Sequence, residues 1–222
     1  MNLKTYIQNK EVNHFTFKGV EVFVKDTITN NISMKQVMTT VDKILPSFVF
    51  RGLDSVYVGN FDFLNKRSVQ AMYENSSIFI TNIQDDVDDM VDDIVHEISH
   101  FVEDNYGNFL YSDQKIQQEF IRKRKRLWMV LDKAGYDVDL DDFLKIDFSF
   151  EFDDFLYKKI GYSALSMISK NIFYSPYAAT SLREYFANGF EAFFTKGDID
   201  RLKKISPKIY LKIIDFLSTY GK

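Results

Sequence analysis

The stretch Asp85–Tyr106, DDVDDMVDDIVHEISHFVEDNY, decides how this chain is interpreted. Its apolar residues recur at the spacing of an α-helix and form one stripe: Val87, Val91, Ile94, Ile98, Phe101 and Val102. Aspartates crowd the first turns, where carboxylates favour the positive end of the helix dipole. The pattern predicts one amphipathic helix that packs its apolar stripe on a core and ends at Gly107.

The centre of this predicted helix reads His96-Glu97-Ile98-Ser99-His100, an H-E-x-x-H motif. Because residues four apart project from one side of a helix, His96 and His100 can reach the same metal ion. Glu97 lies one position further round and can hold a water molecule at that metal. These residues at this spacing indicate a zinc hydrolase. The alternative is an ordinary amphipathic helix with two surface histidines, since short motifs also arise by chance.

The composition narrows the classes of protein to which the chain can belong. Its 222 residues suit one domain, or two lobes that share a cleft. A hydrophobic fraction of 45%, with 22 Phe and 13 Tyr, excludes a disordered protein. The net charge of −4 argues against a general nucleic-acid binder. Because cysteine is absent, any metal must be held by histidine, carboxylate and water.

The N-terminal stretch MNLKTYIQNKEVNHF lacks the continuous apolar segment of a secretory signal. No window of the chain approaches the ~20 apolar residues of a membrane span. We therefore expect a soluble, cytoplasmic or otherwise intracellular protein with no membrane partner, unless it is exported by a non-classical route. The low Gly content and many Lys, Asn, Ile and Phe residues suggest an AT-rich genome, bacterial or phage.

The segment before the motif helix predicts a small mixed sheet with one helix. Val20–Val24 has the β-branched and aromatic content of a strand, and Asn31–Leu45 has helical spacing that ends before Pro46. Short strand-like runs follow at Ser47–Phe50, at Ser55–Val58, near Val69–Tyr73 and at Ser77–Thr81. This order of elements predicts an α+β fold. Ser68–Tyr73 is the candidate edge strand for pairing with an extended peptide substrate.

The segment after the motif helix predicts further helices, at Gln114–Ala134 and at Leu156–Ile172, although Gly161 interrupts the latter. The basic run Arg122–Arg126 suggests a nucleic-acid patch. We favour a solvated helix face instead, because an acidic stretch over 137–154 follows and can offset the basic charge. No nucleic-acid partner is therefore expected.

Two histidines do not complete a catalytic zinc site, which usually has three protein ligands. His14 is the remaining histidine, but it lies far away in a polar N-terminal stretch. A predicted helix over Thr180–Phe194 carries Glu184 and Glu191 on one side, seven positions apart. Spacing alone does not choose between them, and either can also be a surface glutamate.

The segment Tyr177–Phe190, YAATSLREYFANGF, resembles the corresponding stretch of the anthrax lethal factor catalytic domain and the related Pro-Pro endopeptidases. The shared pattern is a Tyr, a Thr three residues later and a Glu seven residues after the Tyr, followed by Phe-Ala and another Phe. The similarity continues through Arg201, Leu202, Lys203, Pro207, Tyr210 and Ile214. The resemblance implies a zincin-like metallopeptidase, with a small mixed sheet, an H-E-x-x-H helix and a mainly helical C-terminal lobe.

The resemblance also implies a role for each matching residue. It makes His96, His100 and Glu184 the ligands of a Zn²⁺ ion, Glu97 the general base, and Tyr177 the group that stabilises the oxyanion. The expected activity is that of a zinc-dependent endopeptidase acting on a protein or peptide substrate. One alternative is a non-catalytic binding or structural protein, phage-encoded or not, that retains the peptidase fold. Another is a nucleic-acid-associated factor that uses the basic run.

We expect one zincin-like domain over residues 1–222. Within it, 1–106 forms an N-terminal lobe with the sheet and active-site helix, and 171–222 forms a helical lobe with the third ligand. Glu184 lies 84 positions after His100, more than the family leads us to expect, so 107–170 is interpreted as a helical insertion. Because of this insertion, the family's preference for cleavage between prolines is not carried over to this chain.

Overall fold

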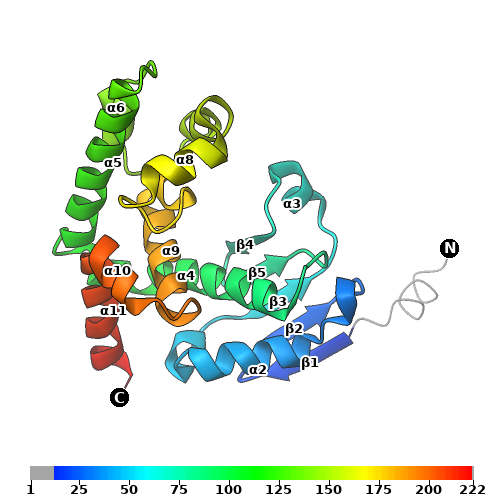
Figure 1. Cartoon of the computed structure of the whole chain (residues 1–222). Coiled ribbons are helices and arrows are strands. Elements are labelled where there is room, and N and C mark those ends of the chain that lie inside the picture. Colours follow the sequence, from blue (N-terminus) through cyan, green and yellow to red (C-terminus); the bar gives the residue numbers. More distant parts are fainter. Residues whose placement is uncertain (1–12, 222) are drawn as a thin grey trace. The chain divides into compact units, whose positions relative to one another are not determined.

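The computed structural model describes residues 13–221 and divides into two compact units, Met1–Phe101 and Val102–Lys222. The first unit contains a small sheet with helices, and the second is helical (Figure 1). The predicted α+β class, with a small mixed N-terminal sheet and a mainly helical C-terminal region, is confirmed.

Five short strands form the sheet of the first unit, in the order β1-β2-β3-β5-β4. They are β1 (Asn13–Phe17), β2 (Val20–Val24), β3 (Ser55–Val58), β4 (Ala71–Glu74) and β5 (Ser77–Ile80). The two outer pairs, β1 with β2 and β4 with β5, are antiparallel, and the two inner pairs are parallel. The predicted edge segment is therefore an edge strand, since β4 has β5 as its neighbour in the sheet.

The core of the first unit lies on one side of this sheet. Alternate residues of the inner strands are fully buried: Val22, Val56, Val58, Ile78 and Ile80. Helix α2 (Met34–Ile44) buries Val37, Met38 and Val41, and it ends two residues before Pro46, as predicted. On the other side of the sheet the rings of Phe23, Tyr57 and Phe79 stack at centroid distances of 5.1 Å. The remaining elements here are η1 (Thr29–Asn31), η2 (Ser47–Phe50) and α3 (Asp62–Arg67).

Two predictions for this unit need correction. Ser47–Phe50, predicted as a strand, is the short 3-10 helix η2 that follows Pro46. Its three apolar residues are buried, and a short buried apolar run suits a strand or a helical turn equally well. The strand predicted near Val69–Tyr73 is present but shifted to Ala71–Glu74.

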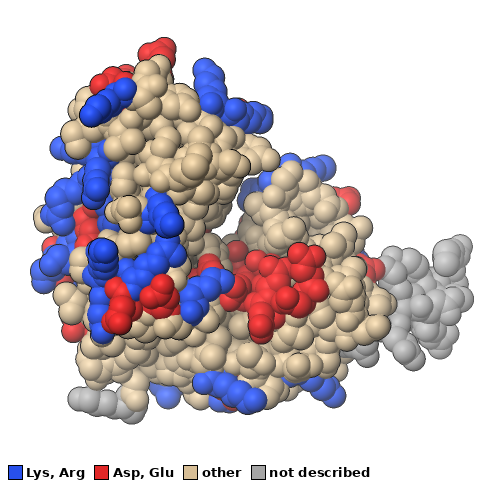
Figure 2. Space-filling model, viewed as in Figure 1, with Lys and Arg blue, Asp and Glu red and all other residues tan. Residues whose placement is uncertain are grey.

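Helix α4 (Val87–Tyr111) is the predicted motif helix, and it is longer than predicted. Gly107 does not end it: the backbone departs from helical angles at Tyr106 (φ −123°, ψ 16°) and the helix then continues to Tyr111. Leu110 in this added part is fully buried, so packing outweighs the low helix propensity of glycine. Figure 2 shows acidic side chains gathered over the first turns of α4, where Asp86, Asp88 and Asp89 are exposed.

Helices make up the second unit. They are α5 (Lys115–Lys133), α6 (Leu140–Leu144), α7 (Phe150–Asp154), the π-helix η3 (Phe155–Gly161), α8 (Tyr162–Ser169), the 3-10 turn η4 (Tyr177–Ala179), α9 (Leu182–Phe194), α10 (Ile199–Ile205) and α11 (Pro207–Tyr220). The predicted interruption at Gly161 is present, since this residue has φ +82° and separates η3 from α8. Among the helices described, none has both the length and the apolar character that crossing a membrane requires.

The basic run on α5 is not simply a solvated face. Arg122, Lys125 and Arg126 are exposed, but Arg124 is only 1% exposed. Its guanidinium donates hydrogen bonds to the carbonyls of Ala179 (2.6 Å), Thr180 (3.2 Å) and Asp142 (2.6 Å). It also lies 3.9 Å from the centre of the Phe152 ring. Arg124 therefore joins α5 to three other segments of this unit.

Candidate metal centre

Helix α4 carries His96, Glu97 and His100, the three defining residues of the H-E-x-x-H motif. The ring centroids of His96 and His100 lie 5.1 Å apart, with the ring planes at 84°. His100 is 6% exposed and Glu97 is 7% exposed, so the motif lies on a buried part of the helix. Ser99, inside the motif, donates its hydroxyl proton to the carbonyl of His96. The motif is thus embedded in the protein rather than displayed on a solvated face.

Glu97 is held in place by the edge strand of the sheet. The backbone N–H of Tyr73 on β4 donates a hydrogen bond to Oε2 of Glu97, at 2.7 Å. The Tyr73 ring lies against Phe101, one turn further along α4, with centroids 6.0 Å apart. A backbone donor is rigid, so this hydrogen bond restrains the orientation of the carboxylate. This contact therefore fixes Glu97 as an oriented acceptor beside β4.

Glu184 lies in the first turn of α9, three residues after the N-cap. Ser181 is the N-cap residue, and its Oγ accepts a hydrogen bond from the backbone N–H of Glu184 at 3.1 Å. A carboxylate in the first turn also favours the positive end of the helix dipole. Leu182, Phe186 and Phe190 bury the opposite side of the helix. The backbone of Glu184 is therefore well anchored.

Tyr177 lies just before this cap, in the turn η4. The Thr180 hydroxyl donates to the Tyr177 carbonyl at 2.9 Å, which closes the turn. Arg124 supports the same turn through the carbonyls of Ala179 and Thr180. The predicted Tyr177 and Glu184 thus belong to one short segment, which Arg124 holds at Ala179 and Thr180 and a helix cap holds at Ser181.

The structure brings three of the predicted residues together. One potential ligand atom from each of His96, His100 and Glu184 lies within 4.8 Å of those of the other two, so the group could hold a metal ion. Two imidazole nitrogens and one carboxylate oxygen are a donor set that suits zinc in a three-ligand site. The donor chemistry therefore fits the predicted metal.

The other two candidate ligands are not members of this group. Glu191 forms an ion pair with Lys196 at 3.3 Å. His14 contacts the carboxylate of Glu21 and stacks on Phe23, with ring centroids 4.5 Å apart. Helical spacing left open whether Glu184 or Glu191 accompanies the histidines. Among the described residues, Glu184 is the one grouped with them.

Two residues that sequence reasoning did not single out lie within electrostatic range of Glu184. Burial raises the pKa of Asp153, and the negative charges of Asp154 and Glu184 add to this effect. Burial likewise raises the pKa of Tyr162, with contributions from Asp153, Tyr157 and Glu184. No motif marks these positions, because they come from α7 and α8 and reach Glu184 only through the fold of the unit.

Comparison of the chain with protein-family models, with curated proteins and with solved structures finds no match. The candidate metal centre is therefore assigned from its own residues and geometry.

Proposed function

We propose that this protein is a zinc-dependent endopeptidase of the zincin type. The observation that carries the proposal is the group of His96, His100 and Glu184, whose potential ligand atoms lie within 4.8 Å of one another. Two of these residues come from an H-E-x-x-H motif on one helix, which is the arrangement that zinc peptidases use. The resemblance of the Tyr177–Phe190 segment to lethal factor-like peptidases supports the same assignment.

The ligand set leaves room for chemistry at the metal. Three protein ligands are typical of a catalytic zinc site, whereas structural sites usually have four. A zinc ion bound there supplies a Lewis acid, which polarises a carbonyl group and lowers the pKa of a water molecule toward neutrality. The protein side chains then have to move protons and stabilise charge.

Glu97 is the residue that moves the proton in this proposal. Its Oε2 accepts a hydrogen bond from the Tyr73 N–H at 2.7 Å, which orients the carboxylate. Glu97 accepts a proton from a water molecule as that water attacks the carbonyl carbon of the scissile bond. It then gives the proton to the leaving amine as the C–N bond breaks, which yields a new carboxyl end and a new amino end.

In this proposal β4 binds the substrate and Tyr177 stabilises the transition state. An extended peptide can add to the sheet beside β4, because among the described strands β4 is paired with β5 alone, and an edge strand can pair with another chain on its second side. Such pairing orients the scissile carbonyl near Glu97, which contacts this same strand. Tyr177 donates a hydrogen bond to the developing oxyanion, an interaction that is strongest in the transition state.

The proposal is tested with Glu97→Gln, which removes the base and keeps the shape of the side chain. We expect the zinc-loaded variant to bind as much metal as the wild type and to cleave a peptide mixture at least ~10²-fold more slowly. The measurement is mass spectrometry of new peptide ends after incubation, with zinc counted in the same samples. The control is Asp132→Asn, the same change of carboxylate to amide at an exposed position on α5, which should leave cleavage unchanged.

Two outcomes would reject the proposal. Undiminished cleavage by Glu97→Gln would remove Glu97 from the chemistry. A zinc-loaded wild type that cleaves none of the peptides would instead identify a metal-binding protein without peptidase activity.

A further inference from the structure

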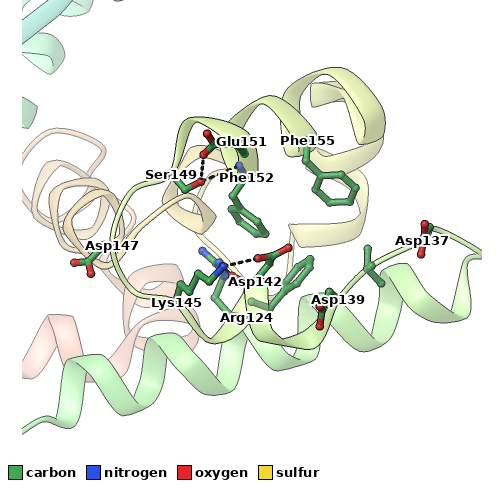
Figure 3. A pocket seen from close by; sticks show the side chains of 12 residues that line it. Arg124, Asp137, Asp139, Asp142, Lys145, Asp147, Ser149, Glu151, Phe152 and Phe155 are labelled. Atoms are coloured by element: carbon green, nitrogen blue, oxygen red, sulfur yellow. Dashed lines mark hydrogen bonds and ion pairs between the residues drawn. The ribbon is translucent and has the colours of Figure 1, made fainter.

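A second concave site lies wholly within the helical unit, away from the residues assigned to the metal. It is a cavity of about 420 Å³ between α5 and the α6–η3 segment, a volume in the range of ligand-binding pockets. Figure 3 shows Arg124 rising from α5 and Phe152 pointing toward it from the facing segment, with Phe155 further along that segment. The cavity therefore has an apolar floor with one buried cation.

Arg124 is a buried charged residue beneath this floor. Its two terminal nitrogens bind backbone carbonyls, whereas its Nε, also buried, has no hydrogen-bond partner within residues 13–221. Burial lowers the pKa of Arg124 to about 9, so the guanidinium is still charged at neutral pH. The Nε atom is closed to solvent, so an occupant of the cavity would contact the apolar floor rather than the Nε itself.

The rim of the cavity has the opposite charge. Carboxylates of Asp137, Asp139, Asp142, Asp147 and Glu151 line it, with Lys145 as the additional basic residue. Lys145 is paired with Asp142 at 2.7 Å. Over the described residues, Asp137, Asp139 and Asp147 take part in no ion pair, and all three are exposed. An occupant with positive groups at the rim would therefore be attracted by several unpaired carboxylates.

The apolar surface extends past the cavity itself. Phe148 is 43% exposed and Phe150 is 69% exposed, and their rings contact each other edge to face at 5.1 Å. Both flank Ser149, which lines the cavity. A small cation contained in the cavity would leave these rings in water, whereas a polypeptide can cover both the cavity and the rings. The surface thus fits a chain better than a compact molecule.

We propose that the cavity between α5 and the α6–η3 segment, with Phe148 and Phe150 at its edge, docks a basic segment of a partner polypeptide in which lysine or arginine alternates with apolar residues. The apolar side chains of that segment cover Phe152, Phe155 and the two exposed rings, and its basic side chains meet Asp139 and Asp147. Docking requires neither the metal nor cleavage of the segment.

The test is a binding measurement that uses no metal. A short fluorescein-labelled peptide, in which lysine alternates with leucine and phenylalanine, is titrated with the full chain and followed by fluorescence anisotropy. Two further peptides carry glutamate in place of lysine, or serine in place of the apolar residues. We expect the first peptide to bind and the other two to bind at least about tenfold more weakly.

Two matched variants locate the binding. Asp139→Asn with Asp147→Asn should weaken binding about fivefold to tenfold, since two attractive charges are lost. Asparagine still caps α6, where the Asp139 side chain accepts from the backbone of Asp141. The control, Asp200→Asn with Asp215→Asn, makes the same change of net charge at exposed positions on α10 and α11 and should bind like the wild type.

A third variant probes the apolar edge. Phe148→Ser with Phe150→Ser removes exposed rings, so it should leave the fold intact and weaken binding at least about threefold. The proposal is overturned if both aspartate pairs have the same effect, or if the glutamate peptide binds as well as the lysine peptide. Equal binding of the lysine–serine peptide, with full competition by spermine, would also overturn it, because the cavity would then be a site for small polycations.

Discussion

The buried arginine of α5 gives a prediction whose size can be worked out from its contacts. Replacing Arg124 by methionine keeps an unbranched chain over the Phe152 ring but removes all donors. The carbonyls of Ala179 and Thr180, both in buried residues, then lose their partner. A buried acceptor without a donor costs about 1–3 kcal/mol. Relief from burying a charge offsets part of this loss, so we expect about 2–4 kcal/mol of destabilisation.

For a chain of this length the change corresponds to a fall in melting temperature of roughly 10 °C. Urea and thermal unfolding, followed by circular dichroism, measure it. Arg126→Met is the control: Arg126 is two positions away on α5 and exposed, so its loss should change the unfolding free energy by less than about 0.5 kcal/mol. Arg124→Lys should fall between the two, since one ammonium group cannot reach three carbonyls at separate positions. Equal melting of Arg124→Met and Arg126→Met would refute the structural role.

Two further predictions concern the packing and the pH dependence of the second unit. A Cβ on Gly189 of α9 would lie 2.6 Å from the Ile209 side chain on α11, so Gly189→Ala should cost about 1–3 kcal/mol. A Cβ on Gly107 would have nothing within 4 Å, so Gly107→Ala should stabilise α4 by about 0.5–1 kcal/mol. The urea midpoints of the two variants should therefore shift in opposite directions. A hydrogen bond from Lys212 lowers the pKa of Asp113 from 3.8 to about 2, so Asp113→Asn should destabilise the protein by ~1 kcal/mol at pH 7. Because the folded pKa lies below the unfolded one, this difference should be complete above about pH 4 and lost as the pH falls through about 2, and a difference that persists at lower pH would contradict the assignment.

The sequence was most informative where one physical pattern dominated. The motif helix was predicted because its apolar stripe is regular, and Val91, Ile94 and Ile98 are indeed buried. Its end was mistaken, because a glycine signal is local whereas the burial of Leu110 depends on the tertiary structure. The same limit explains Arg124: a five-residue basic run gives no sign of which member will point inward.

The candidate metal group shows the same division between local and tertiary information. Spacing four residues apart was enough to place His96 and His100 on one side of a helix. Spacing could not choose between Glu184 and Glu191, which are nearly two turns apart on α9. The resemblance to known peptidases favoured Glu184, and the geometry groups this glutamate with the histidines. Asp153 and Tyr162 carry no local signal, since only the packing of the helical unit brings them near Glu184.

The most direct test of the central claim is the metal content of the purified protein, with Glu184→Ala and Glu191→Ala prepared in parallel. Each substitution removes one carboxylate from α9, so the two variants are matched in charge and location. We predict about one zinc ion per chain in the wild type and in Glu191→Ala, and loss of most of it in Glu184→Ala, because metal binding depends on each ligand. A wild type without tightly bound metal, or loss of zinc in Glu191→Ala alone, would contradict the account.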